Sequence, residues 1–88
     1  MIYLIFACTL LHAGSHQGDC QAIPWGPYST ARACQADMRR DFHGLYLKGR
    51  LYTYTAAGPI KGIAPQDDRN WTGDWYECMR KPTWTPAQ

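Results

Sequence analysis

The sequence has no long apolar segment, no cluster of basic residues and few charges. Its longest apolar run, Ile2 to Leu11, is about half as long as a bilayer-spanning helix, and no Lys or Arg precedes it as in a signal peptide. Charged residues make up 18% of the chain and the net charge is only +2, far from the basic stripe of a nucleic-acid-binding protein. We therefore expect no membrane span, the charge pattern disfavours a nucleic-acid partner, and we interpret the apolar run as part of the fold.

The residue patterns of common enzymes are also missing. No Ser stands in a nucleophile-elbow motif, and the glycines do not have the spacing of a phosphate-binding loop. Asp41 and His43 are two positions apart in a predicted helix, so they point to different sides of it. The acidic residues of the C-terminal third are interpreted as solvated side chains: Asp67, Asp68, Asp74 and Glu77. We therefore predict that the chain is not an enzyme and uses no cofactor.

The cysteines form no C-x-x-C motif, which argues against a zinc ribbon and against a thioredoxin-like redox site. The spacing Cys8-x3-His12-x3-His16-x3-Cys20 does offer two thiolates and two imidazoles, a set that can hold zinc tetrahedrally. This spacing matches no common zinc module, and histidines in a polar loop are usually solvated. We therefore predict no metal site.

Two states of the four cysteines are compatible with the sequence. Reduced core thiols are favoured, because no signal peptide is visible and free cysteine is among the most buried residue types. Disulfides are the alternative, in an oxidising compartment. A hairpin centred near Gly14 would then place Cys8 opposite Cys20, and a helix bearing Cys34 would face Cys78 in the last strand.

The first part of the chain reads as two strands. Residues 1–80 are predicted to form one domain, followed by an extended tail over residues 81–88. Continuous apolarity over residues 1–11 predicts a strand that is buried on both faces. Residues 20–25 predict a second strand, which Pro24 cuts short.

A helix and further strands follow. Residues 30–43 have the spacing of an amphipathic helix, with Ser29 as its N-cap and Gly44 just beyond its C-terminal end. Residues 45–47 and 50–55 are predicted to form either a hairpin with a turn at Lys48-Gly49 or one strand with a bulge there. The last strand is predicted over residues 71–80, with a bulge at Gly73. The expected fold class is α+β, a small antiparallel sheet of order β-β-α-β-β with one helix packed on one face.

Two features are candidates for function. Residues 56–70 form a connection that is unusually long for so small a domain, and long ordered loops often carry binding sites. Aromatic residues make up 14% of the chain, and Trp and Tyr frequently dominate binding surfaces. The predicted partner-binding residues are Trp71, Trp75, Tyr76, Trp84, Tyr52, Tyr54, Arg39 and Arg40.

Several segments share their order with a known group of proteins. These are Met1 to Cys8, the pair Asp19-Cys20, Tyr28-Ser29 through Cys34, and the phrase Trp75 to Cys78. In this respect the chain resembles the small proteins of lambdoid phages and prophages that have a β-β-α-β core and spaced cysteines. The resemblance implies a phage accessory protein in the host cytoplasm, which inhibits a host factor, such as a CRISPR–Cas complex or another host enzyme, by steric occlusion. It transfers no functional residue.

Three further interpretations remain open. One is an exported or periplasmic domain that is stabilised by disulfides and acts at the cell envelope. Another is a single-stranded nucleic-acid binder that combines basic side chains with stacking rings; its residues would be Arg39, Arg40, Lys48, Arg50, Tyr52 and Tyr54. Because one helix covers only one face of a sheet, a homodimer is also compatible with the predicted fold.

Overall fold

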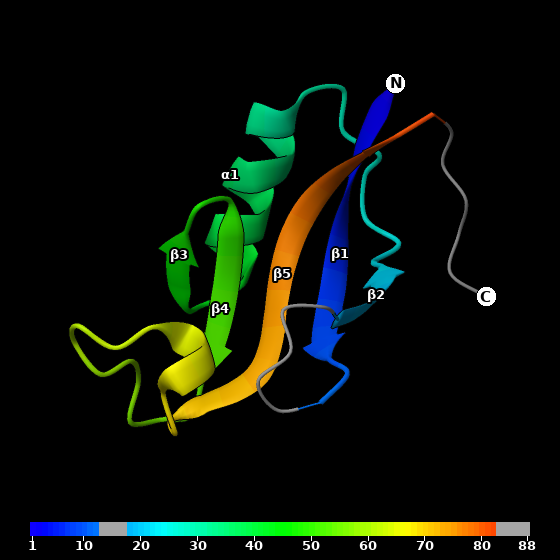
Figure 1. The fold of residues 1–88 in the computed structure, drawn as a ribbon. Coiled ribbons are helices and arrows are strands. Elements are labelled where there is room, and N and C mark those ends of the chain that lie inside the picture. The colour runs from blue at the N-terminus through cyan, green and yellow to red at the C-terminus, as the bar shows by residue number, and fades with distance from the viewer. Residues whose placement is uncertain (13–17, 83–88) are drawn as a thin grey trace.

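The computed structural model describes residues 1–12 and 18–82, which form one antiparallel sheet and one α-helix (Figure 1). The elements follow in the order β1 (Ile2–Leu10), β2 (Gly18–Ala22), α1 (Ala31–Asp41), β3 (Leu45–Leu47), β4 (Arg50–Tyr54), the 3₁₀ turn η1 (Pro65–Asp67) and β5 (Trp71–Lys81). The spatial order of the strands is β2-β1-β5-β4-β3. The predicted α+β class is confirmed, but the chain has three strands after the helix where the predicted order β-β-α-β-β has two. The last strand of the chain lies at the centre of the sheet.

Strand β1 is buried on both faces, as its continuous apolarity predicted. Leu4 and Phe6 face the side of the sheet without the helix, and Ile5 faces the helix. The second strand differs from the prediction, since β2 spans Gly18–Ala22 and ends before Pro24. Strand β5 continues through Lys81, which pairs with Ile2, so the tail begins one residue later than predicted.

The ends of α1 correct two predictions. Thr30, and not Ser29, is the N-cap, because its hydroxyl accepts a hydrogen bond from the amide of Ala33 at 3.1 Å. The helix ends at Asp41, and the Phe42 amide donates to the carbonyl of Met38. Gly44 therefore lies two residues beyond the cap, outside the position expected of a helix-ending glycine.

Gly44 is needed for a different reason, a close approach of two backbone segments. A Cβ atom at this position would lie 2.1 Å from the carbonyl oxygen of Tyr52. We predict that Gly44→Ala lowers the free energy of unfolding by about 3 kcal/mol, at the upper end for overpacking, because backbone must move. Gly58→Ala, whose Cβ would meet open space at φ +72°, should cost only about 1 kcal/mol. Urea unfolding of both variants measures this, and equal small losses would contradict the close approach.

Each face of the sheet carries its own buried cluster. On the helix side, the cluster consists of Ile5, Cys34, Met38 and Leu51. On the helix-free side, it consists of Leu4, Phe6, Cys8, Tyr52 and Trp75. The helix-free face is therefore a second small core and not simply a solvated surface.

One disulfide holds the edge strand β2 to the sheet, and a second joins the helix to the sheet. Cys8–Cys20 joins β1 to β2, and Cys34–Cys78 joins α1 to β5. All four cysteines lie in the described part of the chain, and none is free. The predicted pairing is confirmed, whereas the favoured state of four reduced thiols is wrong.

The turn and bulge predictions are confirmed. Lys48 and Gly49, both with positive φ, connect β3 to β4. Between β4 and β5 the register changes after the Tyr52–Trp75 pair, and Gly73 has φ +87°. In residues 1–12 and 18–82 we find no helix with the length and apolarity to cross a membrane.

Candidate functional site

The structure separates the aromatic residues that were predicted to form one surface. Trp75 is 2% exposed and Tyr52 is 7% exposed, so both rings belong to the helix-free core and offer no contact surface. Trp71 and Tyr54 are partly buried against the same core. Trp84 lies outside the described residues.

Tyr76 lies on the opposite face of the sheet, where it ends a stack of three rings. Phe42 stacks on Tyr76 with a centroid distance of 3.9 Å, and Trp25 stacks on Phe42 at 5.4 Å. Trp25 is 42% exposed, and the sequence analysis did not select it. Its place beside two prolines made it look like a strand end, and only the folded chain brings it to Phe42.

The basic residues Arg39 and Arg50 lie on different sides of the sheet. The Arg39 guanidinium lies 4.3 Å from the Tyr46 ring centroid on the helix side of the sheet, and Arg40 forms ion pairs with two aspartates of its own helix. Arg50 lies on the other side, with its guanidinium 4.8 Å from the Trp75 ring centroid. Because Tyr52 is also buried, the proposed stacking rings and cations are not on one accessible surface.

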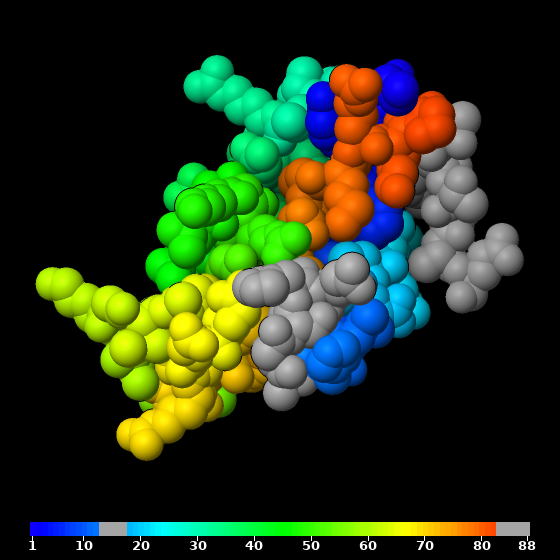
Figure 2. All heavy atoms as spheres, in the orientation of Figure 1, coloured from blue at the N-terminus to red at the C-terminus, as the bar shows by residue number. Residues whose placement is uncertain are grey.

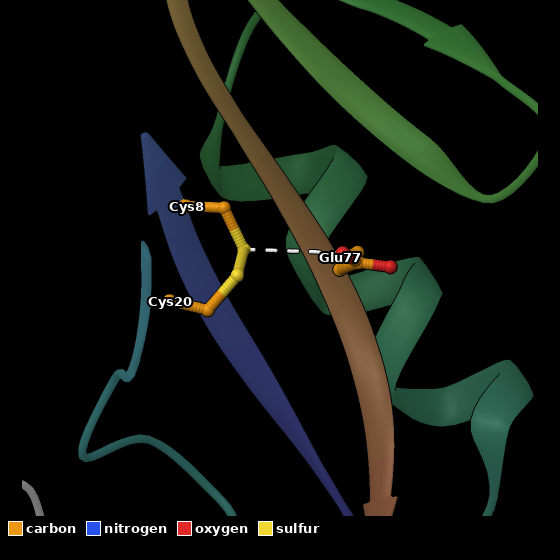
Figure 3. Close-up of side chains that lie close together, drawn as sticks. All are labelled: Cys8, Cys20 and Glu77. Carbon is orange, nitrogen blue, oxygen red and sulfur yellow. Dashed lines mark hydrogen bonds between the residues drawn. A yellow bond between two sulfur atoms is a disulfide. The ribbon is translucent and has the colours of Figure 1, made fainter. Parts of the chain in front are cut away.

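A polar cluster does form on the helix-free face around Glu77 (Figure 3). The indole Nε1 of Trp75 donates to Glu77 Oε1 at 3.0 Å, and Arg50 Nε lies 3.7 Å from the same oxygen. Cys8 Sγ lies 3.9 Å from this oxygen, along the dashed line of Figure 3. A disulfide sulfur carries no proton, so this contact becomes a hydrogen bond only when Cys8 is a thiol.

The structure does not test the Cys–His zinc set that the sequence offered as an alternative. His16 lies outside the described residues, and His12 is exposed. The third polar atom beside Cys8 and Cys20 comes instead from Glu77, which was expected to be solvated. Its position one strand away from Cys8 follows from the β1–β5 register, which the sequence did not reveal.

The long connection over residues 56–70 is an ordered loop whose ends are joined. The amide of Thr55 donates to the carbonyl of Asn70 at 2.9 Å, which closes the loop at its base. Loops with joined ends that are held by their own groups are frequently binding elements. Figure 1 shows this loop extending beyond β4, away from the rest of the sheet.

Asp68 holds this loop from inside, which corrects its interpretation as a solvated acid. It is only 5% exposed, and each carboxylate oxygen accepts a backbone hydrogen bond. Oδ2 accepts from the amide of Ile60 at 2.8 Å, and Oδ1 accepts from the amide of Asn70 at 2.9 Å. The buried carboxylate thus joins the outer part of the loop to its return segment.

The loop presents two isoleucines at its tip. The amide of Ile63 donates to the carbonyl of Ile60 at 3.2 Å, and Gly62 has the positive φ that this turn requires. Ile60 is 39% exposed and Ile63 is 42% exposed, with the exposed Lys61 between them. In Figure 2 the yellow-green atoms of this segment project from the body of the molecule. The result is an apolar tip with a fixed backbone.

Asp68 should be essential for the shape of the loop. We expect Asp68→Ala to lower the free energy of unfolding by about 1–3 kcal/mol, because two backbone amides lose the buried carboxylate that accepts their hydrogen bonds. Amide hydrogen exchange should accelerate at Ile60 and Asn70 and remain slow in β1. Asp67→Ala, at an exposed neighbouring position, is the matched control. Unchanged exchange at Ile60 in Asp68→Ala would contradict the role of this carboxylate.

Two shallow pockets flank the base of the loop. One, of about 320 Å³, lies between the end of β1 and Trp71, and Asp68 lines it. The other, of about 350 Å³, lies between His43 and Pro59, and Tyr54 lines it. Within residues 1–12 and 18–82 the buried hydroxyl of Tyr54 has no hydrogen-bond partner, and its burial, together with the nearby Asp68 carboxylate, raises the pKa of Tyr54.

Comparison with protein-family models, curated proteins and solved structures found no match to this chain. The resemblance to lambdoid phage proteins therefore stays a prediction, and the candidate site rests on the geometry of the loop.

Proposed function

We propose that this chain is a non-enzymatic protein-binding module that works in an oxidising compartment and contacts its partner through the tip of the loop over residues 56–70. The observation that carries the proposal is the exposure of Ile60 and Ile63 on a turn that the buried Asp68 holds in place. Two neighbouring apolar side chains on a fixed, projecting backbone are costly in water and favourable in a complementary pocket.

The held backbone favours binding because little conformational entropy is lost on association. Immobilising flexible groups consumes part of the binding free energy, and a preorganised loop avoids that cost. Ile60 and Ile63 would fill an apolar depression in the partner, and Lys61 would lie at its polar rim. Binding then blocks whatever that depression normally accepts, which is inhibition by steric occlusion.

The disulfides favour an oxidising compartment. Cys34–Cys78 joins the helix to the central strand and Cys8–Cys20 holds the edge strand, so both packed layers depend on them. Disulfides persist outside the reducing cytosol, where small domains with thin cores use them for stability. The exported alternative is therefore the better version of the proposal, and a cytoplasmic CRISPR–Cas complex is a less suitable partner. A phage protein that blocks a host factor at the cell envelope is one specific form of this exported alternative.

Site-specific photo-crosslinking in the source cells tests this proposal. A photo-reactive phenylalanine analogue at Lys61 should give one discrete adduct with another protein, whereas the same analogue at Arg32, exposed on α1, should not. Adding Ile60→Ser and Ile63→Ser should remove the adduct and leave the melting temperature within a few degrees, since both side chains are exposed. An adduct of equal yield from Arg32, or one that survives both serine substitutions, would overturn the proposal.

A further inference from the structure

The side chains of Cys8, Cys20 and Glu77 come from three neighbouring strands and point toward one another (Figure 3). One sulfur from each cysteine and one carboxylate oxygen all lie within 4.8 Å of one another. We propose that the reduced form of this protein binds one Zn²⁺ ion through Cys8 Sγ, Cys20 Sγ and Glu77 Oε1. This site is separate from the loop tip and does not depend on the proposed function.

The distance between the Cys8 sulfur and the Glu77 oxygen already approximates that of a tetrahedral ligand set. With Zn–S bonds near 2.3 Å and Zn–O bonds near 2.1 Å, tetrahedral angles place a sulfur and an oxygen ligand about 3.6 Å apart and two sulfurs about 3.8 Å apart. Cys8 Sγ and Glu77 Oε1 are 3.9 Å apart before any adjustment. Cys8 and Cys20 are directly opposite across β1 and β2, with a Cα–Cα distance of 4.1 Å, so their sulfurs can separate by side-chain rotation alone.

The groups around the Glu77 carboxylate are compatible with its role as a zinc ligand. The Trp75 indole N–H, 3.0 Å from Glu77 Oε1, fixes the orientation of the carboxylate, as groups behind a metal ligand commonly do. Two thiolates and one carboxylate around Zn²⁺ leave one net negative charge, and Arg50 lies 3.7 Å from Glu77 to compensate it. Thiolates select zinc and other soft ions over magnesium or calcium, and three protein ligands leave a fourth position for water.

Metal binding and the disulfide exclude each other. A thiol or phosphine reductant supplies two electrons, with two protons from water, and converts Cys8–Cys20 into two thiols while the reductant is oxidised. Zn²⁺ then displaces both thiol protons, because the thiolate is the ligand. In the disulfide neither sulfur carries the negative charge that the ion requires. The same three residues would therefore form a disulfide under oxidising conditions and a metal site under reducing ones.

Anaerobic titration of phosphine-reduced protein with Co²⁺, followed by displacement with Zn²⁺, tests the inference. One equivalent should give the visible bands of tetrahedral cobalt with thiolate charge transfer, and Zn²⁺ should remove them. Glu77→Gln should weaken binding by roughly tenfold or more, comparable to the loss of a supporting metal-site residue. Cys8→Ser should abolish the bands.

Alkylation of the reduced wild-type chain gives an independent readout that needs no variant. Bound Zn²⁺ should protect Cys8 and Cys20 from iodoacetamide at least tenfold more than it protects Cys34 and Cys78, as mapped by mass spectrometry. Equal protection of all four cysteines, absence of tetrahedral cobalt bands, or bands unaffected by Glu77→Gln would each overturn the inference. None of these results would affect crosslinking from Lys61, so the two proposals fail separately.

Discussion

Replacing Cys34 and Cys78 by alanine is expected to lower the free energy of unfolding by about 4 kcal/mol. The disulfide spans 44 positions of sequence, and the loop-closure entropy that it removes from the unfolded chain has this magnitude. Cys34 is fully buried between α1 and the central strand β5, so the alanines also leave apolar volume unfilled. A domain of 88 residues has little stability in reserve.

The second disulfide is the matched comparison. Cys8–Cys20 spans only 12 positions, so Cys8→Ala with Cys20→Ala should cost about 3 kcal/mol, less than the first pair. Guanidinium unfolding under non-reducing conditions measures both losses. A larger loss for Cys8 and Cys20, or no loss for Cys34 and Cys78, would show that the helix does not depend on its covalent link to β5.

Trp75→Ala is expected to lower the free energy of unfolding by about 3–5 kcal/mol, the range for deleting a buried aromatic ring. The ring is 2% exposed and lies beside Tyr52 and Phe6 in the helix-free core. It also reaches toward the edge strand, since a Cβ atom on Gly18 would lie 2.3 Å from its Cη2 atom. Trp75 therefore connects the central strand to β2 across β1.

The same substitution separates the two roles considered for Trp75. If the ring were a surface anchor, alanine would weaken partner binding and leave stability nearly unchanged. As a core residue it should do the opposite, with a loss of several kcal/mol in urea unfolding. Trp75→Phe should lose about 1–2 kcal/mol, because it keeps part of the apolar volume and loses the hydrogen bond to Glu77. A small loss for Trp75→Ala would contradict the second core.

Local patterns predicted much of the fold. The apolar run gave β1, the helical spacing with its buried Cys34 and Met38 gave α1, and Lys48-Gly49 gave the β3–β4 turn. Each of these features depends on residues that are close in sequence, where backbone preference and periodicity decide the conformation. The disulfide pairing followed from the same elements, once the strands and helix were placed.

The candidate site depended on contacts between distant residues, and those were not predictable. Asp68 has the sequence context of a solvated turn, and only the folded loop brings the Ile60 amide, eight positions away, to its carboxylate. The predicted aromatic surface is divided for another reason. Neighbouring residues of a strand point to opposite faces of the sheet, so Trp75 packs in one core and Tyr76 in the other. The two-residue alternation of side chains along a strand, applied to residues 71–80, places Trp75 and Tyr76 on opposite faces.

The oxidised, disulfide-stabilised state is the central claim of this account, because the layer packing and the choice of compartment both depend on it. Acid quenching of the source cells, alkylation under denaturing conditions and non-reducing peptide mapping measure that state directly. We expect two disulfide-linked peptide species, one joined through Cys8–Cys20 and one through Cys34–Cys78, and no alkylated cysteine. Four alkylated cysteines in the cellular protein would contradict the claim and return the chain to a reducing compartment.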